Sequence, residues 1–185
     1  MSNAIDASKR RRAGHYEVLG ETYAKFEFFE NGWNPYSRFL DVEKVDLILR
    51  KARPGGVTYR EVQVKYGKLY EVRRKREQDL FDVTSWRFFS DDEFSTPGVS
   101  RDLYLAYILA KDTGYTRDIC IFPVMLFAEL VKAAIPTGGK RKVCISRLKG
   151  TSDRWVLRKL SRFTKVDDIS CVDVSQFWRN FHQLE

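Results

Sequence analysis

The spacing of apolar residues predicts one helix and then three strands in the first half of the chain. Apolar side chains recur at three- and four-residue intervals over residues 16–30, which is the pattern of one buried helix face. Asn31-Gly32 follows, and both residues favour the left-handed conformation that ends helices. Three strand-like runs cover residues 33–39, 42–51 and 57–66. The turn sequence Pro54-Gly55-Gly56 joins the last two runs and predicts a hairpin.

The second half of the chain predicts further strands and two helices. Residues 103–110 are continuously apolar, which is typical of a strand buried on both faces. Residues 119–122 predict another strand, and Pro123 suits the start of a helix over 124–134. A hairpin over 142–148 and 155–160 precedes a final helix over 174–184, with Asp173 as its N-cap. Residues 69–89 fit either an exposed helix or an extended charged ribbon. This order of elements predicts an α/β domain with a mixed sheet.

The composition adds a substantial core and a basic surface to this picture. The 185 residues are 43% hydrophobic and 14% aromatic, which suits one folded domain. The net charge of +8 favours polyanionic partners. One basic cluster alone is typical of a solvated face, whereas three clusters combined with a site for phosphate chemistry would favour nucleic acid. The clusters are Lys9-Arg10-Arg11-Arg12, then Arg73, Arg74, Lys75 and Arg76, and then Lys140, Arg141 and Lys142.

Other features of the sequence argue against several classes of protein. The three cysteines are widely separated and the two histidines are isolated, which does not fit a disulfide framework or a zinc site. No apolar run reaches the length of about 18 residues that a membrane helix needs. No apolar stretch follows the N-terminal basic residues, as it would in a signal peptide. We therefore expect a cytoplasmic protein with no membrane partner. Ser2-Asn3-Ala4 is typical of an expression-tag remnant and is not expected to contribute to the fold.

Polar residues inside two predicted strands indicate a chemical site. Strand alternation places Gln63 and Lys65 on one face and the neighbouring valines on the other. Asp46 interrupts an apolar run in the preceding strand, where an unpaired carboxylate would be costly. If the two strands are neighbours, the Asp46 carboxylate, the Gln63 amide and the Val64 carbonyl supply oxygen ligands for Mg²⁺ or Mn²⁺.

Lys65 and Glu21 complete this candidate site. The Lys65 ammonium can hold a scissile phosphate, while the metal ion lowers the pKa of the attacking water. Glu21 on the first helix can act as a water-mediated metal ligand or as a proton acceptor. The ordered set of residues therefore indicates hydrolysis of a phosphodiester bond.

The same residues resemble a known superfamily of nucleases. The segments Gly20-Glu21, Gly32-Trp33, Val45-Asp46-Leu47-Ile48 and Val62-Gln63-Val64-Lys65-Tyr66-Gly67 look like the motifs of the PD-(D/E)xK superfamily. The Gln-x-Lys variant is similar to Mrr-type restriction enzymes, archaeal-type Holliday junction resolvases and group I intron homing endonucleases. The resemblance implies a restriction-endonuclease-like α-β-β-β-α-β core over residues 15–136. A basic flexible arm at 1–14 would precede this core, and a C-terminal extension at 137–185 would pack on it.

The expected function is therefore Mg²⁺-dependent cleavage of DNA by Glu21, Asp46, Gln63 and Lys65, and the resemblance implies a homodimer or a higher homo-oligomer. Gln63 stands where most relatives have an acid, and Glu61 two residues away would substitute for it only in part. Asp41 is a rival for the role of Asp46 but fits the strand less well. Gln63 keeps two alternatives open: a catalytically inactive nucleic-acid-binding protein on the same fold, and a protein-interaction module.

Three aromatic residues can either stack on exposed bases or pack in the core, and core packing is favoured for each: Tyr66, Trp86 and Trp155.

Overall fold

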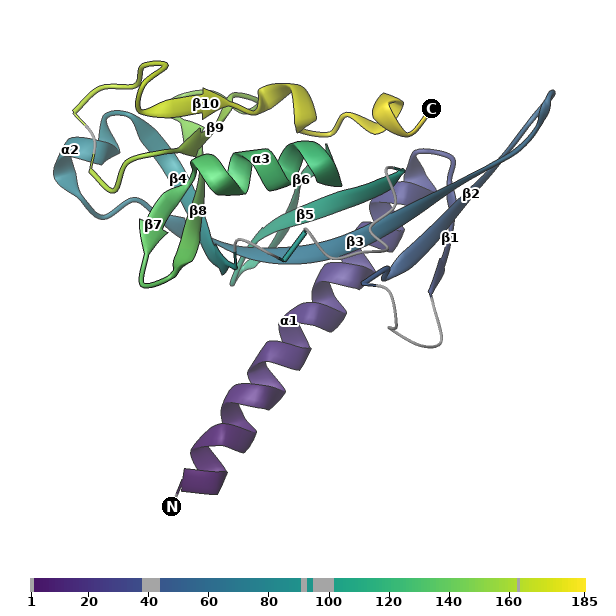
Figure 1. Cartoon of the computed structure of the whole chain (residues 1–185), viewed down its shortest axis with the longest axis horizontal. Helices are drawn as coiled ribbons and strands as arrows, with labels where there is room; N and C mark the ends of the chain where they lie inside the picture. Colours follow the sequence, from purple (N-terminus) through teal and green to yellow (C-terminus); the bar gives the residue numbers. More distant parts are fainter. Residues whose placement is uncertain (1, 38–43, 91–92, 95–101, 163) are drawn as a thin grey trace.

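The described part of the chain is mostly β, with ten strands in one sheet and a long N-terminal helix (Figure 1). The computed structural model describes residues 2–37, 44–90, 93–94, 102–162 and 164–185, with side chains from Gly14 onward. The helices are α1 (Ser2–Glu30), α2 (Lys75–Gln78) and α3 (Val124–Ala133), and two 3-10 helices, η1 (Ser175–Phe177) and η2 (Phe181–Leu184), end the chain. The strands are β1 (Asn34–Ser37), β2 (Leu47–Arg53), β3 (Gly56–Glu71), β4 (Phe81–Phe89), β5 (Leu103–Lys111), β6 (Gly114–Pro123), β7 (Ile135–Thr137), β8 (Lys140–Leu148), β9 (Trp155–Arg158) and β10 (Cys171–Asp173).

The long strand β3 connects the two halves of the sheet. The strand order is β1-β2-β3-β4-β8-β9-β10, with β5 paired to β3, β6 paired to β5 and β7 paired to β8. The pairing of β3 with β5 is parallel, and the other pairings among the described residues are antiparallel. β2 pairs with β3 as far as Val62, whereas β4 pairs with β3 from Leu69 onward.

The predicted α/β fold with an α-β-β-β-α-β core is wrong. Residues 69–89, which fitted either a helix or a ribbon, form the end of β3, the single turn α2 and the strand β4. β4 then pairs along most of its length with β8, so the C-terminal hairpin of β8 and β9 extends the sheet. The charged residues that obscured β4 gather at the turn before it. Within β4 itself, Phe81, Val83 and Phe89 alternate into the core, as a strand with one buried face requires.

The predicted final helix is also wrong. Its apolar residues are buried at helical spacing, but the backbone forms η1 and η2 with a break at Arg179, whose φ is +49°. Arg179 donates hydrogen bonds to the buried Glu27 carboxylate and to the carbonyl of Arg117. The predicted N-cap role of Asp173 is wrong as well, because Val174 is the N-cap of η1, although Asp173 Oδ1 accepts a hydrogen bond from the N–H of Ser175 at 2.8 Å. The hydrogen bonds of Arg179 to Glu27 and Arg117 thus interrupt what would otherwise be a continuous α-helix.

Other predicted elements are confirmed. The hairpin of β2 and β3, the hairpin of β8 and β9, and the helix after Pro123 occur as predicted. The helix predicted over 16–30 is part of α1, which begins at Ser2 and so includes the residues expected to form an arm.

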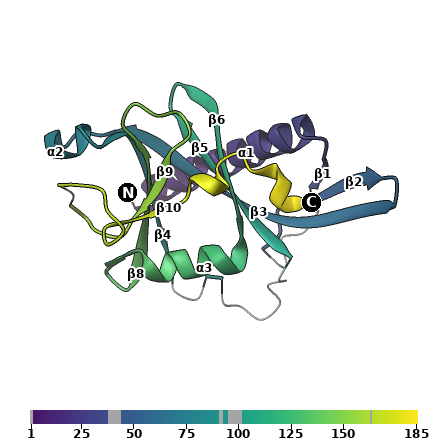
Figure 2. The same ribbon diagram turned by 90° about the horizontal axis from the view of Figure 1, so that it is seen from above.

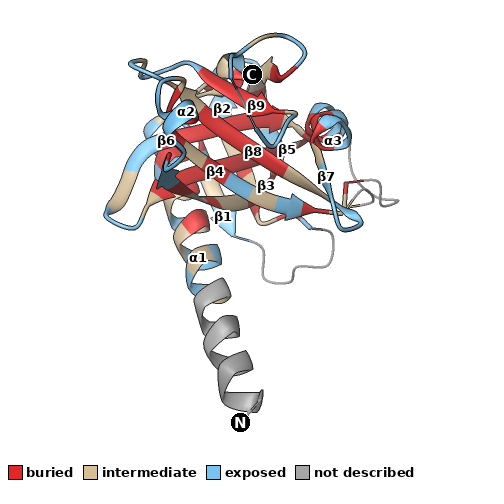
Figure 3. Cartoon of the chain, turned by 90° about the vertical axis from the view of Figure 1, so that its left-hand side faces the viewer, coloured by how far each residue is buried: buried red, intermediate tan, exposed pale blue. Residues whose placement is uncertain are grey.

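The sheet has a hydrophobic cluster on each face. α1 covers one face through Ala24 and Phe28, and α3 covers the other through Phe127 and Val131, so that β5 lies between the two helices (Figure 2). Buried residues concentrate in the strands, while turns and the outer side of α3 are exposed (Figure 3). The prediction that β5 is buried on both faces is confirmed, because Leu105 belongs to one cluster and Ala106 to the other.

Candidate functional site

A gap in the pairing of β3 creates the candidate site. Among the described residues, β2 accompanies β3 up to Val62 and β4 joins it at Leu69, while β5 runs along β3 from Glu61 to Lys68. One edge of β3 between Val62 and Leu69 therefore lacks a strand partner in the described part of the chain. Side chains take the place of the missing strand along this edge.

Asp46 lies at the β2 end of the gap. Its backbone N–H donates a hydrogen bond to the carbonyl of Val62 at 3.0 Å, and its carboxylate Oδ2 accepts one from the backbone N–H of Val64. In a strand, the N–H and C=O of one residue point to the same neighbour, so the Val64 carbonyl faces this edge too. Asp46 and the Val64 carbonyl thus lie at the same point of the gap.

Arg87 lies at the β4 end of the gap. Its Nη1 donates a hydrogen bond to the carbonyl of Tyr66 at 3.2 Å. Tyr66 is two residues beyond Val64, and its carbonyl therefore points to the same edge of β3. An acidic side chain and a basic side chain satisfy the backbone groups that a strand would otherwise pair.

Lys65 extends from the gap into a mixed set of charges. Its side chain is 17% exposed, and its Nζ lies 3.7 Å from Oε1 of Glu93. Burial lowers the pKa of the Lys65 ammonium below its ordinary value, and the nearby Arg87 guanidinium lowers it further. Glu93, Asp46 and Glu17 act on this pKa in the opposite direction without reversing the shift. The Lys65 ammonium is thus influenced by one other cation, Arg87, and by three carboxylates.

Gln63 lies on the same face of β3 as Lys65, as strand alternation predicts, and is buried. Within the described residues, no three His, Cys, Asp or Glu side chains come close enough to hold a metal ion. Mg²⁺ in phosphate-processing sites is often bound by one or two carboxylates, with water and substrate oxygens as the other ligands. The Asp46 carboxylate and the Val64 carbonyl fit that smaller requirement, and the Gln63 amide is the nearest residue in sequence that can add an oxygen.

The helix carboxylate that shares a cavity with Lys65 and acts on its pKa is Glu17, not Glu21. Glu17 lines a cavity of about 530 Å³ together with residues of β3 and β4. Glu21 does not line this cavity, and its Oε2 lies 3.8 Å from the ammonium of Lys25 on the same helix. Gly20 lets the helix approach β3, because a Cβ at this position would meet the Cβ of Tyr66 at 3.2 Å. The cavity is lined by Tyr16, Glu17, Val64, Lys65, Tyr66, Lys68, Tyr70, Trp86 and Arg87.

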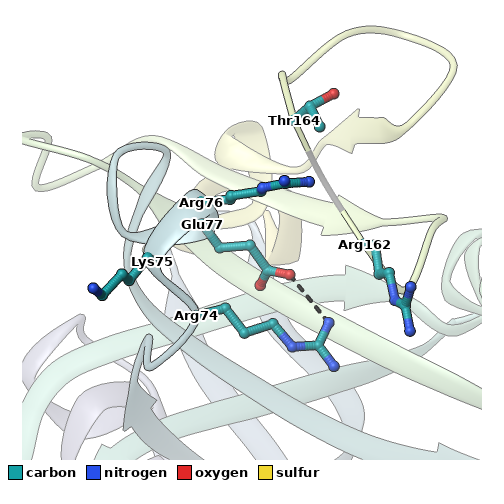
Figure 4. Close-up of a pocket in the computed structure, with 6 residues that line it drawn as sticks. All are labelled: Arg74, Lys75, Arg76, Glu77, Arg162 and Thr164. Atoms are coloured by element: carbon teal, nitrogen blue, oxygen red, sulfur yellow. Dashed lines mark hydrogen bonds and ion pairs between the residues drawn. The ribbon is translucent and has the colours of Figure 1, made fainter.

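The structure brings two of the predicted basic clusters together. Arg73, Arg74 and Lys142 line one pocket of about 430 Å³ with Arg158 of β9. A neighbouring pocket of about 530 Å³ lies between α2 and the chain after β9 (Figure 4). There the Arg74 guanidinium points to the buried Glu77 carboxylate, 3.3 Å away, while Lys75 points outward. The remaining members of the predicted set lie around these pockets or on β8: Arg76, Lys140 and Arg141.

Three functional candidates were missed from the sequence. Glu17 lies one helical turn before Glu21 on the same face, so the periodicity of the helix could have indicated it. No such signal marked Arg87 or Glu93, because their positions near Lys65 depend on where β4 pairs in the sheet. Trp155 is fully buried as expected, whereas Trp86 is 43% exposed and does not pack in the core. Asp41 and the side chains of Lys9, Arg10, Arg11 and Arg12 lie outside the described residues.

Comparisons with known protein families, with characterised proteins and with solved structures gave no match. No helix among the described residues is long and apolar enough to cross a membrane. The case for a function therefore depends on the geometry and charge of the gap in β3.

Proposed function

We propose that this protein is a metal-dependent DNA endonuclease whose active site is the gap in β3. One observation carries the proposal: the backbone of β3 holds the Asp46 carboxylate within electrostatic reach of the partly buried Lys65 ammonium. An acid and a cation held together at a break in a sheet can bind a phosphodiester and a divalent cation at once. The net charge of +8 and the pocket shared by Arg73 and Lys142 favour a polyanionic substrate.

Each residue then has a defined role in the proposed reaction. Asp46, Gln63 and the Val64 carbonyl would hold Mg²⁺ or Mn²⁺, which supplies Lewis-acid stabilisation and a more acidic bound water. Lys65 and Arg87 bind the non-bridging phosphate oxygens and stabilise the negative charge that develops on them. Glu17 accepts the proton of the attacking water as the new O–P bond forms. The bond from phosphorus to the leaving oxygen then breaks, and that oxygen takes up a proton from solvent water.

Nicking of supercoiled plasmid tests this proposal. We expect cleavage with Mg²⁺ or Mn²⁺ and none in EDTA. Asp46→Asn and Lys65→Met should each reduce the cleavage rate at least about 100-fold, while Glu129→Gln, an exposed position on α3, should leave it unchanged. Cleavage by both active-site variants at the wild-type rate would refute the site, and absence of wild-type cleavage with either metal would refute the enzyme.

A second candidate, nucleic-acid binding without cleavage, is favoured by one observation. The described residues lack a cluster of three His, Cys, Asp or Glu side chains for a metal ion, and a neutral amide at Gln63 binds a cation less strongly than a carboxylate. This candidate predicts salt-dependent DNA binding that is insensitive to divalent metal. Measuring DNA affinity with and without Mg²⁺ separates the two candidates. Only the endonuclease is expected to bind DNA more tightly when Mg²⁺ is present.

A further inference from the structure

An exposed aromatic strip runs beside the candidate site, on the face of the sheet that carries Tyr66. The strip consists of Tyr70 at the end of β3 and Trp86 and Phe88 of β4, which are 40%, 43% and 40% exposed. The rings of Tyr70 and Trp86 are stacked with centroids 6.2 Å apart, and Trp86 meets Phe88 edge-on at 5.6 Å. Cross-strand aromatic pairs stabilise a sheet, but this packing leaves about two fifths of each residue's surface in water. Large apolar side chains gathered on an exposed face often mark a binding surface.

Two lysines give this strip a positive charge. The Lys142 ammonium lies 5.0 Å from the centre of the Trp86 ring, and the Lys68 ammonium lies 5.3 Å from that of Tyr70. Each lysine therefore lies beside a ring of a residue that is about two-fifths exposed. Rings that accept a planar group beside ammonium groups that attract phosphate are the combination by which proteins bind unpaired nucleotides.

The strip also connects the proposed active site with the basic pocket. Tyr70 and Trp86 line the cavity that contains Lys65 and Glu17, and they also line the pocket that contains Arg73, Arg74 and Lys142. A strand that stacks on these two rings can therefore have phosphates in the basic pocket and its next phosphates near Lys65.

We propose that the aromatic strip binds single-stranded DNA by base stacking, with Lys68 and Lys142 contacting its phosphates. This inference deepens the proposed function, on which its choice of DNA rests, by naming unpaired DNA as the substrate class. A duplex keeps its bases stacked on one another, so it cannot use the rings and binds through the basic residues alone. The enzyme should consequently prefer DNA with single-stranded segments.

Binding measurements in EDTA test the strip independently of cleavage. We expect the full chain to bind an oligothymidine more tightly than a duplex of equal length, by fluorescence anisotropy. Trp86→Ala and Tyr70→Ala should each weaken binding to the single strand about tenfold and leave duplex binding unchanged. Tyr59→Ala is the matched control, because Tyr59 is an aromatic residue of β3 that is 57% exposed at the distant hairpin. An effect of Tyr59→Ala equal to that of Trp86→Ala, or equal affinity for single strand and duplex, would overturn the inference.

Two further readouts separate stacking from charge. Trp86→Phe should retain single-strand binding but lose most of the fluorescence quenching that the oligonucleotide causes in the wild type. Lys142→Ala should lower the slope of log affinity against log salt by about 0.7, the value for one phosphate of a single strand, while Trp86→Ala leaves this slope unchanged. If the wild type fails to cleave but these results hold, the strip is confirmed as a binding surface and only the catalytic proposal fails. If cleavage occurs without a preference for single strands, the strip fails and the endonuclease stands.

Discussion

The carboxylate of Asp46 accepts a hydrogen bond from the backbone N–H of Val64, at the point where β2 no longer accompanies β3. This contact gives Asp46 two separable properties. As a hydrogen-bond acceptor it satisfies a β3 amide that has no strand partner in the described residues, and as an anion it acts on Lys65. A chemical role depends on its charge, whereas a structural role depends on its oxygen.

Two substitutions of Asp46 distinguish these roles. Asp46→Asn keeps an oxygen that can accept from Val64, so we expect little loss of stability but at least about a 100-fold loss of cleavage. Asp46→Ala leaves the buried amide unsatisfied and should also lower the free energy of unfolding by about 1–3 kcal/mol. Urea denaturation and plasmid nicking measure the two effects. Full activity of Asp46→Asn would show that the role of Asp46 is structural alone.

A second prediction concerns the two glutamates of α1. Glu17 lines the cavity with Lys65, whereas Glu21 pairs with Lys25. We expect Glu17→Gln to reduce the cleavage rate and Glu21→Gln to leave it near that of the wild type, with thermal stability changed little in either variant because both side chains are accessible to water. Parallel single-turnover assays of the two variants provide the comparison. A larger loss in Glu21→Gln would restore the role that the sequence motif assigns to it.

Lys65 predicts a pH dependence of stability with a definite sign. Because burial lowers its pKa in the folded protein, the unfolded state binds more protons between that lowered pKa and the ordinary value of 10.5. The free energy of unfolding of the wild type should therefore rise with pH across this window relative to Lys65→Met. Urea denaturation of both proteins at about pH 8 and about pH 10 tests the sign. Near neutral pH we expect Lys65→Met to be at least as stable as the wild type while inactive, since it removes a partly buried charge. The measured quantity is the free energy of unfolding of Lys65→Met minus that of the wild type. A value of this difference that is smaller near pH 8 than near pH 10 would contradict the prediction.

The sequence indicated the centre of the candidate site better than the fold around it. Asp46, Gln63 and Lys65 could be placed near one another because a short hairpin and strand alternation are local properties. Arg87 and Glu93 could not, because β4, which contains Arg87 and ends before Glu93, was hidden by the charged turn at α2, and its pairing with β8 is a long-range contact. The exposure of Trp86 was missed for the same reason: a tryptophan on an unrecognised strand has no assignable face. The final helix failed at Arg179, where a contact with a residue on α1 outweighs helical periodicity.

Gly67 gives a test of the packing beside the gap. A Cβ at this position would lie 2.5 Å from Cε1 of the buried Tyr107 and 2.6 Å from Oγ of Ser85, so the ring of Tyr107 needs a glycine beneath it. Gly67→Ala should lower the free energy of unfolding by about 1–3 kcal/mol through overpacking. The matched control is Gly55→Ala, where no atom of the described residues lies within 4 Å of the added Cβ; we expect a change within about 0.5 kcal/mol there. Equal effects of the two substitutions in thermal denaturation would show that the close packing at Gly67 can relax without cost.

The last prediction concerns Glu27, which joins three distant parts of the chain. Its fully buried carboxylate accepts hydrogen bonds from Arg117 of β6 at 2.9 Å and from Arg179 after η1 at 3.0 Å. Both arginines have positive φ, at +66° and +49°, a conformation that non-glycine residues rarely adopt. The ion pairs to Glu27 hold the two strained backbones in place, and they fix α1 against β6 and the C-terminal segment.

We therefore expect Glu27→Gln to destabilise the protein strongly. Removing one partner of a fully buried pair costs about 3–5 kcal/mol, and the lower end applies here because Arg117 is half exposed. Since the lost charge frees Arg179 from its strained conformation, amide exchange should increase in residues 175–185 more than in β5. Glu30→Gln on the exposed side of the same helix is the control and should change the free energy of unfolding by no more than about 0.5 kcal/mol. Uniform exchange throughout the sheet, with no excess in the C-terminal segment, would mean that Glu27 supports the core as a whole and does not anchor that segment.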